Sequence, residues 1–531
     1  MSGLSDDTEV ESGLPKRMSA NLPKWALPMF FAAGLAALNI LWLATIFVYL
    51  SYDNFTDHIE ATVSNISLLF SRGAEIYPNP SQQLYGLLYG PFLYIVNALP
   101  RLACSSIVSA QACHDNIILI EKLPGVAAYG FAYSAAYAIA YNASRSHLVS
   151  LFSLSAFVCM GNLCTTVDFP HIAYWNRSEP FLLCISAFAL LAALKLPPKN
   201  AIILLGLLAG FASGFKIHGA VYIVPSAVMA LTRSESIKSC LRYIIFAAII
   251  CIATILAPFA LSNVSLSGYL QYLSLASHHH FDSEKMIDSI LFLIELIVLA
   301  LFAMGLSGKT LSKSYVAYAG ALIFASAMTI LPASKEGAGA HHMLPFAPHF
   351  LYLVSFAISF ESSRQTASNA LARLLFVAVI VVLPALAFRF YAVYLRTAEL
   401  IRDSAAVSEQ RRSLEDLASR YPGVAMAPGT SSNYSAYYHS PVLTDLGSPL
   451  IVDAGAYMDL ERAGMNAHPL EESLSACRNE YWVAPGDKPW TVKSYYSNDS
   501  LFSQDIIELF KRKYATIEVS TTYTVWKCRR R

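Results

Sequence analysis

Long apolar segments separated by short polar connections make up most of the chain up to residue 393. A helix that crosses a membrane needs about 20 consecutive apolar residues. The run 201–231 is longer and is interrupted by Lys216 and His218, so we interpret it as two short spans that meet near Lys216. The pattern predicts about 11 transmembrane helices. Besides the divided run, the predicted spans are 25–50, 119–141, 147–167, 180–194, 243–262, 287–306, 314–331, 343–360 and 374–393.

The apolar segment 84–103 differs from these spans because it is rich in Tyr, Gly and Pro. We interpret it as an amphipathic helix in the membrane interface, with a full span as the alternative. The distribution of Lys and Arg favours the interfacial position, because a full span would invert every later connection and remove the excess of positive charge from the inner side. The N-terminal tail, residues 1–24, is then cytoplasmic. The first span has no small-residue cleavage site and is expected to be retained.

Residues 394–531 have a different composition, in which short apolar runs alternate with polar helical stretches. This alternation predicts a small α/β domain, and the span count places it outside the membrane. It follows a transmembrane domain at 25–393, whose first outer loop, 51–118, is expected to carry interfacial helices. The predicted strands are 424–428, 449–455, 481–485 and 515–520, and the predicted helices are 402–420, 457–475 and 501–513.

Composition agrees with a polytopic α-helical membrane protein. Hydrophobic residues make up 55% of the chain and charged residues 14%, against about 25% charged residues in a typical soluble domain, and the mean hydropathy is +0.47. The net charge of +1 gives no indication of nucleic-acid binding. The nine cysteines form no CxxC pair. In an exported compartment Cys104 can pair with Cys113 and Cys477 with Cys528, although buried thiols are the alternative.

The predicted topology brings all the polar clusters to the outer face. This alignment indicates a single outward-facing site, because random placement would distribute the clusters over both faces. The clusters are Asp53–Glu60, Asp168–Glu179, Lys216–His218, His278–Lys285 and Lys335–His342.

The acidic cluster after the first span is the strongest chemical signal. Asp57 and Glu60 lie one helical turn apart, so both carboxylates can share one face of a helix. Two such acids can bind a divalent cation, or divide into a general base and a metal ligand. The alternative is an interfacial helix that exposes its acids to water.

Three further segments give the chain a family resemblance. Gly73–Pro78 and Tyr85–Pro91 follow the acidic cluster, and Tyr174–Pro180 directly precedes a span. A first span, an outer acidic motif and such segments resemble the GT-C superfamily of membrane glycosyltransferases, which includes protein O-mannosyltransferases, aminoarabinose transferases and oligosaccharyltransferase subunits. The resemblance covers residues 25–393 in architecture and only short patches in motif. It implies a sugar donor carried on a polyprenyl phosphate and chemistry at the outer face of a bacterial inner membrane.

The resemblance also implies roles for the acids. Asp57 is the expected general base, with Asp53 as the second candidate. Glu179 matches an acidic residue at the outer start of an early span, where it can also simply stabilise the helix N-terminus beside Pro180. Asp57, Glu60 and Glu179 are the expected ligands of a divalent cation, Mg²⁺ or Mn²⁺, if one is used.

The expected partners of the donor are basic and aromatic side chains. A lysine within the membrane must pair or reach the interface, so Lys216 is expected to bind the donor phosphate, with Arg177 or Lys335. The alternative is a lysine that only reaches the interface. The expected substrate-binding residues are Tyr89, His218, His341 and His342.

These features favour a glycosyltransferase that moves a sugar from a polyprenyl-phosphate donor to an acceptor hydroxyl, with inversion at the anomeric carbon. Its expected partners are the lipid-linked donor, membrane lipids and a glycan, lipid or protein acceptor. A secondary transporter or lipid flippase is the alternative, since many spans and an intramembrane lysine fit that class as well. A membrane scaffold is a weaker third reading that leaves the carboxylates without a role.

Overall fold

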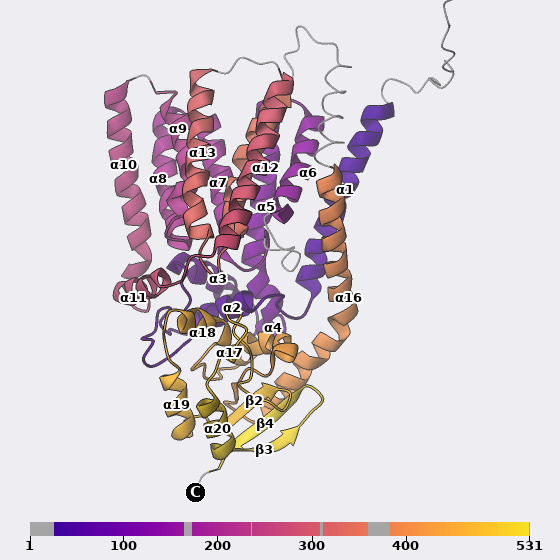
Figure 1. Ribbon diagram of the computed structural model, residues 1–531, viewed down its shortest axis with the longest axis vertical. Coiled ribbons are helices and arrows are strands. Elements are labelled where there is room, and N and C mark those ends of the chain that lie inside the picture. Colours follow the sequence, from indigo (N-terminus) through magenta and orange to yellow (C-terminus); the bar gives the residue numbers. More distant parts are fainter. Residues whose placement is uncertain (1–25, 164–172, 235, 308–311, 359–382, 530–531) are drawn as a thin grey trace, which may run out of the picture.

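A bundle of long helices is joined end to end with a smaller C-terminal unit in the computed structural model (Figure 1). The structure describes residues 26–163, 173–234, 236–307, 312–358 and 383–529. The helices of the bundle are α1 (Ala26–Ser51), α5 (Ile117–Ser144), α6 (His147–Leu163), α7 (Ser178–Lys195), α8 (Pro198–Phe215), α9 (Val224–Leu231), α10 (Ile237–Leu256), α12 (Ser283–Ser307), α13 (Lys313–Ala333) and α14 (Ala347–Ile358).

Within the described residues, five helices are long and apolar enough to cross a membrane. They are Ala32–Ser51, Ser178–Lys195, Pro198–Phe215, Lys238–Ala260 and Lys313–Ala333, and each coincides with a predicted span. Parts of the predicted spans 147–167, 343–360 and 374–393, together with Asp168, lie outside the described residues.

The predicted division of the run 201–231 is confirmed. Helix α8 ends at Phe215, and after a turn at Lys216 and His218 the chain continues as the 3₁₀ helix η1 (Gly219–Ile223) and then α9. Gly219 makes this turn possible, because a Cβ at this position would lie 2.1 Å from the carbonyl oxygen of Ala212.

Short helices lie between the bundle and the C-terminal unit (Figure 1). Pro91–Ile107 forms α3, which buries Leu93, Tyr94 and Asn97 and exposes Leu99 and Ile107. It is therefore amphipathic, as predicted for 84–103. The other elements of this layer are α2 (His58–Ser71), α4 (Ala110–Asp115), η2 (Ala257–Ala260), α11 (Leu266–Ser277) and η3 (Ala340–Phe346).

The C-terminal unit contains a four-stranded sheet in the order β1-β2-β4-β3. Strands β1 and β2 are parallel, and the β2–β4 and β3–β4 pairs are antiparallel. The strands are β1 (Ala425–Met426), β2 (Tyr481–Pro485), β3 (Tyr514–Val519) and β4 (Tyr523–Cys528). Strand β4 was not predicted, because Lys527 and the basic residues that follow hide its period-two pattern.

The predicted strand 449–455 is wrong as a member of this sheet. Its backbone pairs instead with the loop between α2 and α3, where the Leu84 amide donates to the Ile451 carbonyl at 2.7 Å and the Asp453 amide to the Leu84 carbonyl at 3.0 Å. The apolar run is visible in the sequence, but its pairing partner, Leu84, is remote, so the local pattern does not predict this pairing.

Helices surround the sheet. The predicted helix 457–475 is divided in two, because Gly464 adopts a positive φ of 90° that ends the first piece. The long helix α16 leads out of the bundle into the C-terminal unit (Figure 1). The helices are α16 (Leu383–Arg420), η5 (Ser431–His439), α17 (Ser440–Asp445), α18 (Ala454–Arg462), α19 (His468–Ser475) and α20 (Gln504–Lys513).

Both disulfides that the sequence allowed are present. Cys104 pairs with Cys113 and joins α3 to α4, with a Cα–Cα distance of 5.9 Å. Cys477 pairs with Cys528 and joins the segment after α19 to the end of β4, with a Cα–Cα distance of 6.0 Å.

Buried carboxylates hold the C-terminal unit against the short helices. Asp453 caps α18 and accepts hydrogen bonds from Thr62 (2.6 Å) and Asn65 (2.8 Å), both on α2. Asp445 accepts from Arg101 Nε of α3 at 2.8 Å and lies 2.7 Å from His114 Nδ1 of α4. These bonds fix the C-terminal unit against α2, α3 and α4.

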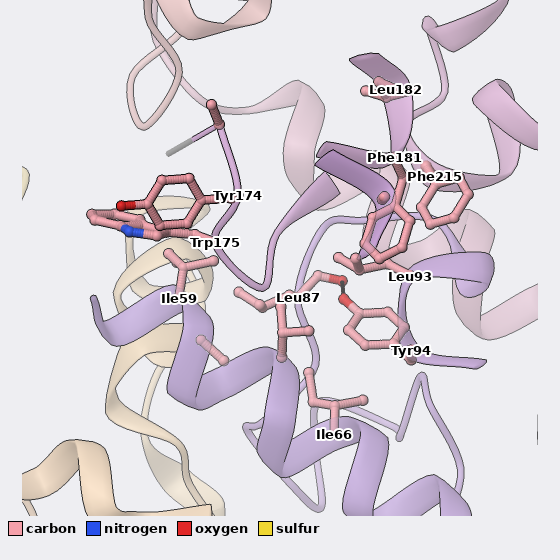
Figure 2. Close-up of a cluster of buried hydrophobic side chains, with 14 of the residues drawn as sticks. Ile59, Ile66, Leu87, Leu93, Tyr94, Tyr174, Trp175, Phe181, Leu182 and Phe215 are labelled. Carbon is pink, nitrogen blue, oxygen red and sulfur yellow. Dashed lines mark hydrogen bonds between the residues drawn. The ribbon is translucent and has the colours of Figure 1, made fainter. Parts of the chain in front are cut away.

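A buried hydrophobic cluster supports the layer between the two parts of the molecule (Figure 2). Ile59 lies near Trp175 at one side of the cluster, and Leu87 lies near its centre. At the other side the rings of Phe181 and Phe215 stack, with centroids 4.7 Å apart. Each of these five residues stands one or two positions from a polar residue of the predicted site, so apolar packing sets the position of the polar groups.

Candidate active site

The predicted base lies at the start of α2. Asp57 is the N-cap residue of this helix and is 2% exposed. Its Oδ2 accepts a hydrogen bond from Arg177 Nη1 at 2.8 Å, and its Oδ1 lies 2.8 Å from His58 Nδ1. The acid therefore stands between a guanidinium from the loop before α7 and an imidazole of its own helix.

These two neighbours decide the charge of Asp57. Burial alone would raise its pKa, but the His58 ring and the Arg177 guanidinium outweigh burial and lower the pKa to about 2. Asp57 is thus a carboxylate over the whole physiological pH range.

Glu60 is completely buried, and its oxygens are used by hydrogen bonds. Oε1 accepts from the Tyr49 hydroxyl and from the Asn176 amide (3.0 Å), and Oε2 accepts from the Thr56 amide (3.0 Å) and hydroxyl (2.7 Å). Glu60 therefore ties the end of α1, the start of α2 and the segment before α7 together.

A second buried group joins α7 and α8. Glu179, in the first turn of α7, accepts a hydrogen bond through Oε1 from Lys216 Nζ at 2.7 Å. Its Oε2 lies 3.6 Å from Arg177 Nε. Arg177 therefore stands between Glu179 and Asp57, so the two predicted acids belong to one continuous network of charges.

The histidine loop, residues 335–342, closes this network from a third side. His342 Nε2 accepts from Lys216 at 3.2 Å, and His341 Nε2 lies 3.8 Å from Glu179 Oε1. The rings of His342 and His218 stack, with centroids 5.2 Å apart. Burial lowers the pKa of His341 to about 3, so this imidazole is neutral at pH 7. One of its ring nitrogens can then donate a hydrogen bond and the other can accept one.

Tyr89 lies across the cationic groups. Its hydroxyl accepts from Arg177 Nη2 at 3.4 Å, and the Lys216 ammonium lies 5.5 Å from the centroid of its ring. The structure thus brings together eight of the predicted residues around Arg177 and Lys216: Asp57, Arg177, Glu179, Lys216, Tyr89, His218, His341 and His342.

Two predicted residues have other partners. Asp53 pairs with Arg411 of α16, with 2.5 Å between Oδ1 and Nη1, at the junction with the C-terminal unit. Lys335 donates to the backbone carbonyls of Ala276 and Ser277 at 3.3 Å each, and so caps α11. The charge pattern of the sequence could not separate these structural cations and anions from those of the site.

Two groups beside Lys216 and Asp57 keep unused hydrogen-bond donors. Within the described part of the chain, neither Arg177 Nε nor His342 Nδ1 has a hydrogen-bond partner, although both atoms are buried. Because Lys216 can only donate, His342 Nε2 accepts, and the proton of the neutral ring is on Nδ1. A buried donor without a partner is costly, and a ligand with acceptor oxygens would remove that cost.

The predicted metal ligands already have other partners. Asp57 and Glu179 face Arg177 and Lys216, and Glu60 already accepts four hydrogen bonds. Among the residues that the structure describes, no group of three or more His, Cys, Asp or Glu side chains is arranged to hold a metal ion. The predicted ligand set therefore does not fit a divalent cation in this arrangement.

Comparison with known proteins gives a fold and no relative in sequence. No protein-family model matches the chain, and no curated protein matches it. Among solved structures, it resembles the apo form of ArnT from Cupriavidus metallidurans with a TM-score of 0.55 and 13% identity, over 93% of this chain and 97% of that one. The structure of the same ArnT bound to undecaprenyl phosphate matches with a TM-score of 0.54 and 12% identity, over 95% of this chain and 98% of that one. The chain therefore shares the fold of these ArnT structures.

The C-terminal unit supplies residues near Asp57 that the sequence did not indicate. The rings of Tyr434 and Tyr495 lie 6.3 Å and 6.4 Å from that of His58, between centroids. Burial and neighbouring charges set the pKa values of His58 and Tyr89, and the negative charge of Asp459, on α18, raises both. These residues are more than 300 positions from Asp57 in sequence, so no local spacing connects them to the acidic motif.

The C-terminal unit also holds the histidine loop in place. Glu336 receives a double hydrogen bond from Arg462 of α18, with 2.6 Å between Oε2 and Nε. His279 lies between the two parts, with its ring nitrogens 3.3 Å from the Glu336 carbonyl and 3.0 Å from the Asp459 carbonyl. The predicted cluster His278–Lys285 therefore supports the histidine loop through His279.

Proposed function

We propose that this protein is a membrane glycosyltransferase, which transfers a sugar from a polyprenyl-phosphate donor to an acceptor hydroxyl at the outer face of a bacterial inner membrane. In this proposal the C-terminal unit lies outside, the N-terminus lies in the cytoplasm, and the anomeric carbon is inverted. The observation that carries the proposal is the buried group of Lys216, Arg177 and His342, with unused donors beside the carboxylates of the GT-C fold.

An anionic phosphate fits this group. Lys216 is 7% exposed and Arg177 6% exposed, so both charges would act on a ligand in a medium of low dielectric constant. Arg177 Nε and His342 Nδ1 can each donate to a phosphate oxygen. The similarity to an ArnT structure that contains undecaprenyl phosphate supports a lipid-linked phosphate as the ligand.

Donor binding would also activate the base. Arg177 is one of the groups that lower the pKa of Asp57, and the donor phosphate competes for its guanidinium. When Arg177 turns part of its charge toward the phosphate, the pKa of Asp57 rises and its carboxylate becomes a better proton acceptor. The base would then be most effective only when the donor is bound.

The chemical step is a direct displacement. The acceptor oxygen forms a bond to the anomeric carbon while the bond from that carbon to the phosphate oxygen breaks, and the acceptor proton passes to Asp57. Lys216 and Arg177 stabilise the charge that develops on the departing polyprenyl phosphate, which is the largest contribution expected in such a site. Glu60 fixes the start of α2, and Glu179 orients Lys216 and Arg177.

Transfer of radiolabelled sugar by the purified protein in lipid tests this function, with a panel of polyprenyl-phosphate sugars as donors and with Mg²⁺, Mn²⁺ or a chelator added. Replacing Lys216 by Gln should raise the donor KM by about tenfold or more, since a buried charge-assisted bond to the phosphate is lost. The matched variant Lys335→Gln should leave the donor KM unchanged, because Lys335 caps α11. No transfer from any donor by folded protein would contradict the proposal, and flux across proteoliposomes would then test the transporter alternative.

A further inference from the structure

The groups around Asp57 form an ordered series that leads from the bundle to the C-terminal unit. Lys216 contacts Glu179, Arg177 contacts both Glu179 and Asp57, and Asp57 contacts His58. At the end of the series, His58 faces tyrosines of the C-terminal unit. The cationic end has a ligand in the proposed function, whereas the aromatic end has none.

Displacement at an anomeric carbon requires the incoming and departing oxygens on opposite sides of that carbon. If the departing phosphate is held at Lys216 and Arg177, the acceptor must approach from beyond Asp57. The residues found there are His58, whose side chain is 20% exposed, and Tyr495, which is 56% exposed. His58 and Tyr495 are therefore partly exposed on the side from which the acceptor has to enter.

Neighbouring groups hold the tyrosines in place, and the Lys285 ammonium lies 5.7 Å from the centroid of the Tyr495 ring. Tyr495 and Tyr496 stand in a tight turn closed by the Lys493–Ser500 bridge and by a hydrogen bond from the Ser494 amide to the Asp499 carbonyl at 2.7 Å. Tyr434 belongs to η5, and its ring stacks on that of Tyr437 at 5.6 Å. Within the described residues, the buried hydroxyl of Tyr434 has no hydrogen-bond partner.

A carboxylate accompanies these rings. Asp459 accepts a hydrogen bond from the Tyr496 hydroxyl through Oδ1, while its charge acts on His58 and Tyr89. Rigid aromatic faces beside a carboxylate and an imidazole match the surface of a sugar ring, since its C–H faces pack on aromatic rings and its edge presents hydroxyl donors. An extended peptide offers neither a flat C–H face nor a rim of hydroxyls.

We propose that Tyr434, Tyr495 and Asp459 form the acceptor subsite and that the acceptor presents a sugar ring to it. The role as an acceptor subsite rests on the proposed function, whereas the binding of a sugar ring is a separate property that can be measured by itself. Tyr495 packs against the ring face, Asp459 accepts from ring hydroxyls, and the hydroxyl to be glycosylated points toward Asp57. The C-terminal unit thereby selects the acceptor, and the bundle binds the donor.

Saturation-transfer NMR on the full-length protein in nanodiscs tests the subsite without any donor. The probes are methyl glycosides of glucose, galactose, mannose and N-acetylglucosamine, with glycerol as a polyol without a ring and a short Ser/Thr peptide as the competing acceptor class. At least one glycoside should receive saturation at its ring C–H protons. The affinity should fall by about three- to tenfold in Tyr495→Ala, from the loss of ring packing, and should be retained in Tyr495→Phe.

Asp459→Asn should weaken glycoside binding, since a neutral amide accepts hydrogen bonds less strongly than a carboxylate. Tyr394→Ala, which removes a 67% exposed tyrosine of α16, is the matched control and should bind as the wild type does. Equal binding in the wild type and Tyr495→Ala, no binding of any glycoside, or binding of the peptide alone would overturn the proposal. Because no donor is present, glycoside binding can be established even if sugar transfer fails.

Discussion

Replacing Asp57 by Asn is the sharpest test of the catalytic assignment. The amide has nearly the same shape as the carboxylate, so its one oxygen can still accept from Arg177 while its NH2 group faces His58. The negative charge and the ability to accept a proton are lost. A general base contributes about 10²- to 10⁴-fold to a rate. Transfer by Asp57→Asn should therefore fall by at least about 100-fold, while the protein remains inserted and able to bind the lipid-linked donor.

The same substitution has an effect on stability that follows from the pKa. The pKa of Asp57 falls from 3.8 in the unfolded chain to about 2 in the folded protein, under the opposing actions of burial and of His58 and Arg177. A shift of this size corresponds to about 2 kcal/mol of stability from the ionised carboxylate. Since the folded pKa is depressed, this contribution is present above about pH 4 and is lost as the pH falls toward about 2.

Thermal unfolding of the wild type and Asp57→Asn between pH 7 and pH 3 measures this contribution. The difference between the two proteins should be constant near neutral pH and should shrink below about pH 4. Asp53→Asn is the matched control, because Asp53 pairs with Arg411 at a partly exposed position outside the charge network. Transfer retained in folded Asp57→Asn, or lost to the same degree in Asp53→Asn, would refute the assignment of the base.

Three further substitutions test how the site is supported. Asp453→Ala removes three hydrogen bonds, one of which caps α18, so unfolding of the C-terminal unit should become easier by about 3 kcal/mol in thermal and proteolysis assays; an unchanged midpoint would contradict this. Glu336→Gln removes the charge from the double bond to Arg462 and should speed amide exchange in the histidine loop and lower kcat, which would fail if both stayed at the wild-type values. Gly219→Ala places a Cβ 2.1 Å from a backbone oxygen and should displace Lys216, raising the donor KM; wild-type kinetics would show that the turn tolerates a side chain.

Several parts of the site were accessible from the sequence because their signals are local. The interruption of an apolar run at Lys216 predicts a helix break, and the spacing of Glu179 and Pro180 before a span predicts a helix N-terminus. A membrane-embedded charge must find a partner, so the outer acids and the buried lysine could be grouped before any contact was known. The contacts among Asp57, Arg177, Glu179 and Lys216 agree with that grouping.

Other roles required the contacts themselves. Asp57 and Glu60 are equivalent in the sequence, yet Glu60 accepts four hydrogen bonds and Asp57 faces Arg177 and His58. Lys335 and Lys216 both belong to polar clusters that the predicted topology brings to one face, but only Lys216 meets Glu179. A carboxylate or an ammonium takes its role from the groups that surround it in space, and local spacing does not specify them.

By itself, the sequence determined the class of this protein: apolar runs of membrane-spanning length, a small α/β unit after them, and polar clusters that a single topology brings to one face. Periodicity and hydropathy are properties of neighbouring residues, so these features can be read along the chain. The tertiary structure alone decided which acid faces Arg177 and His58, which cation pairs with Glu179, and that tyrosines of the C-terminal unit lie beside His58. Those choices depend on contacts between residues hundreds of positions apart, and hydrogen bonding and burial at such contacts set the chemistry of each group.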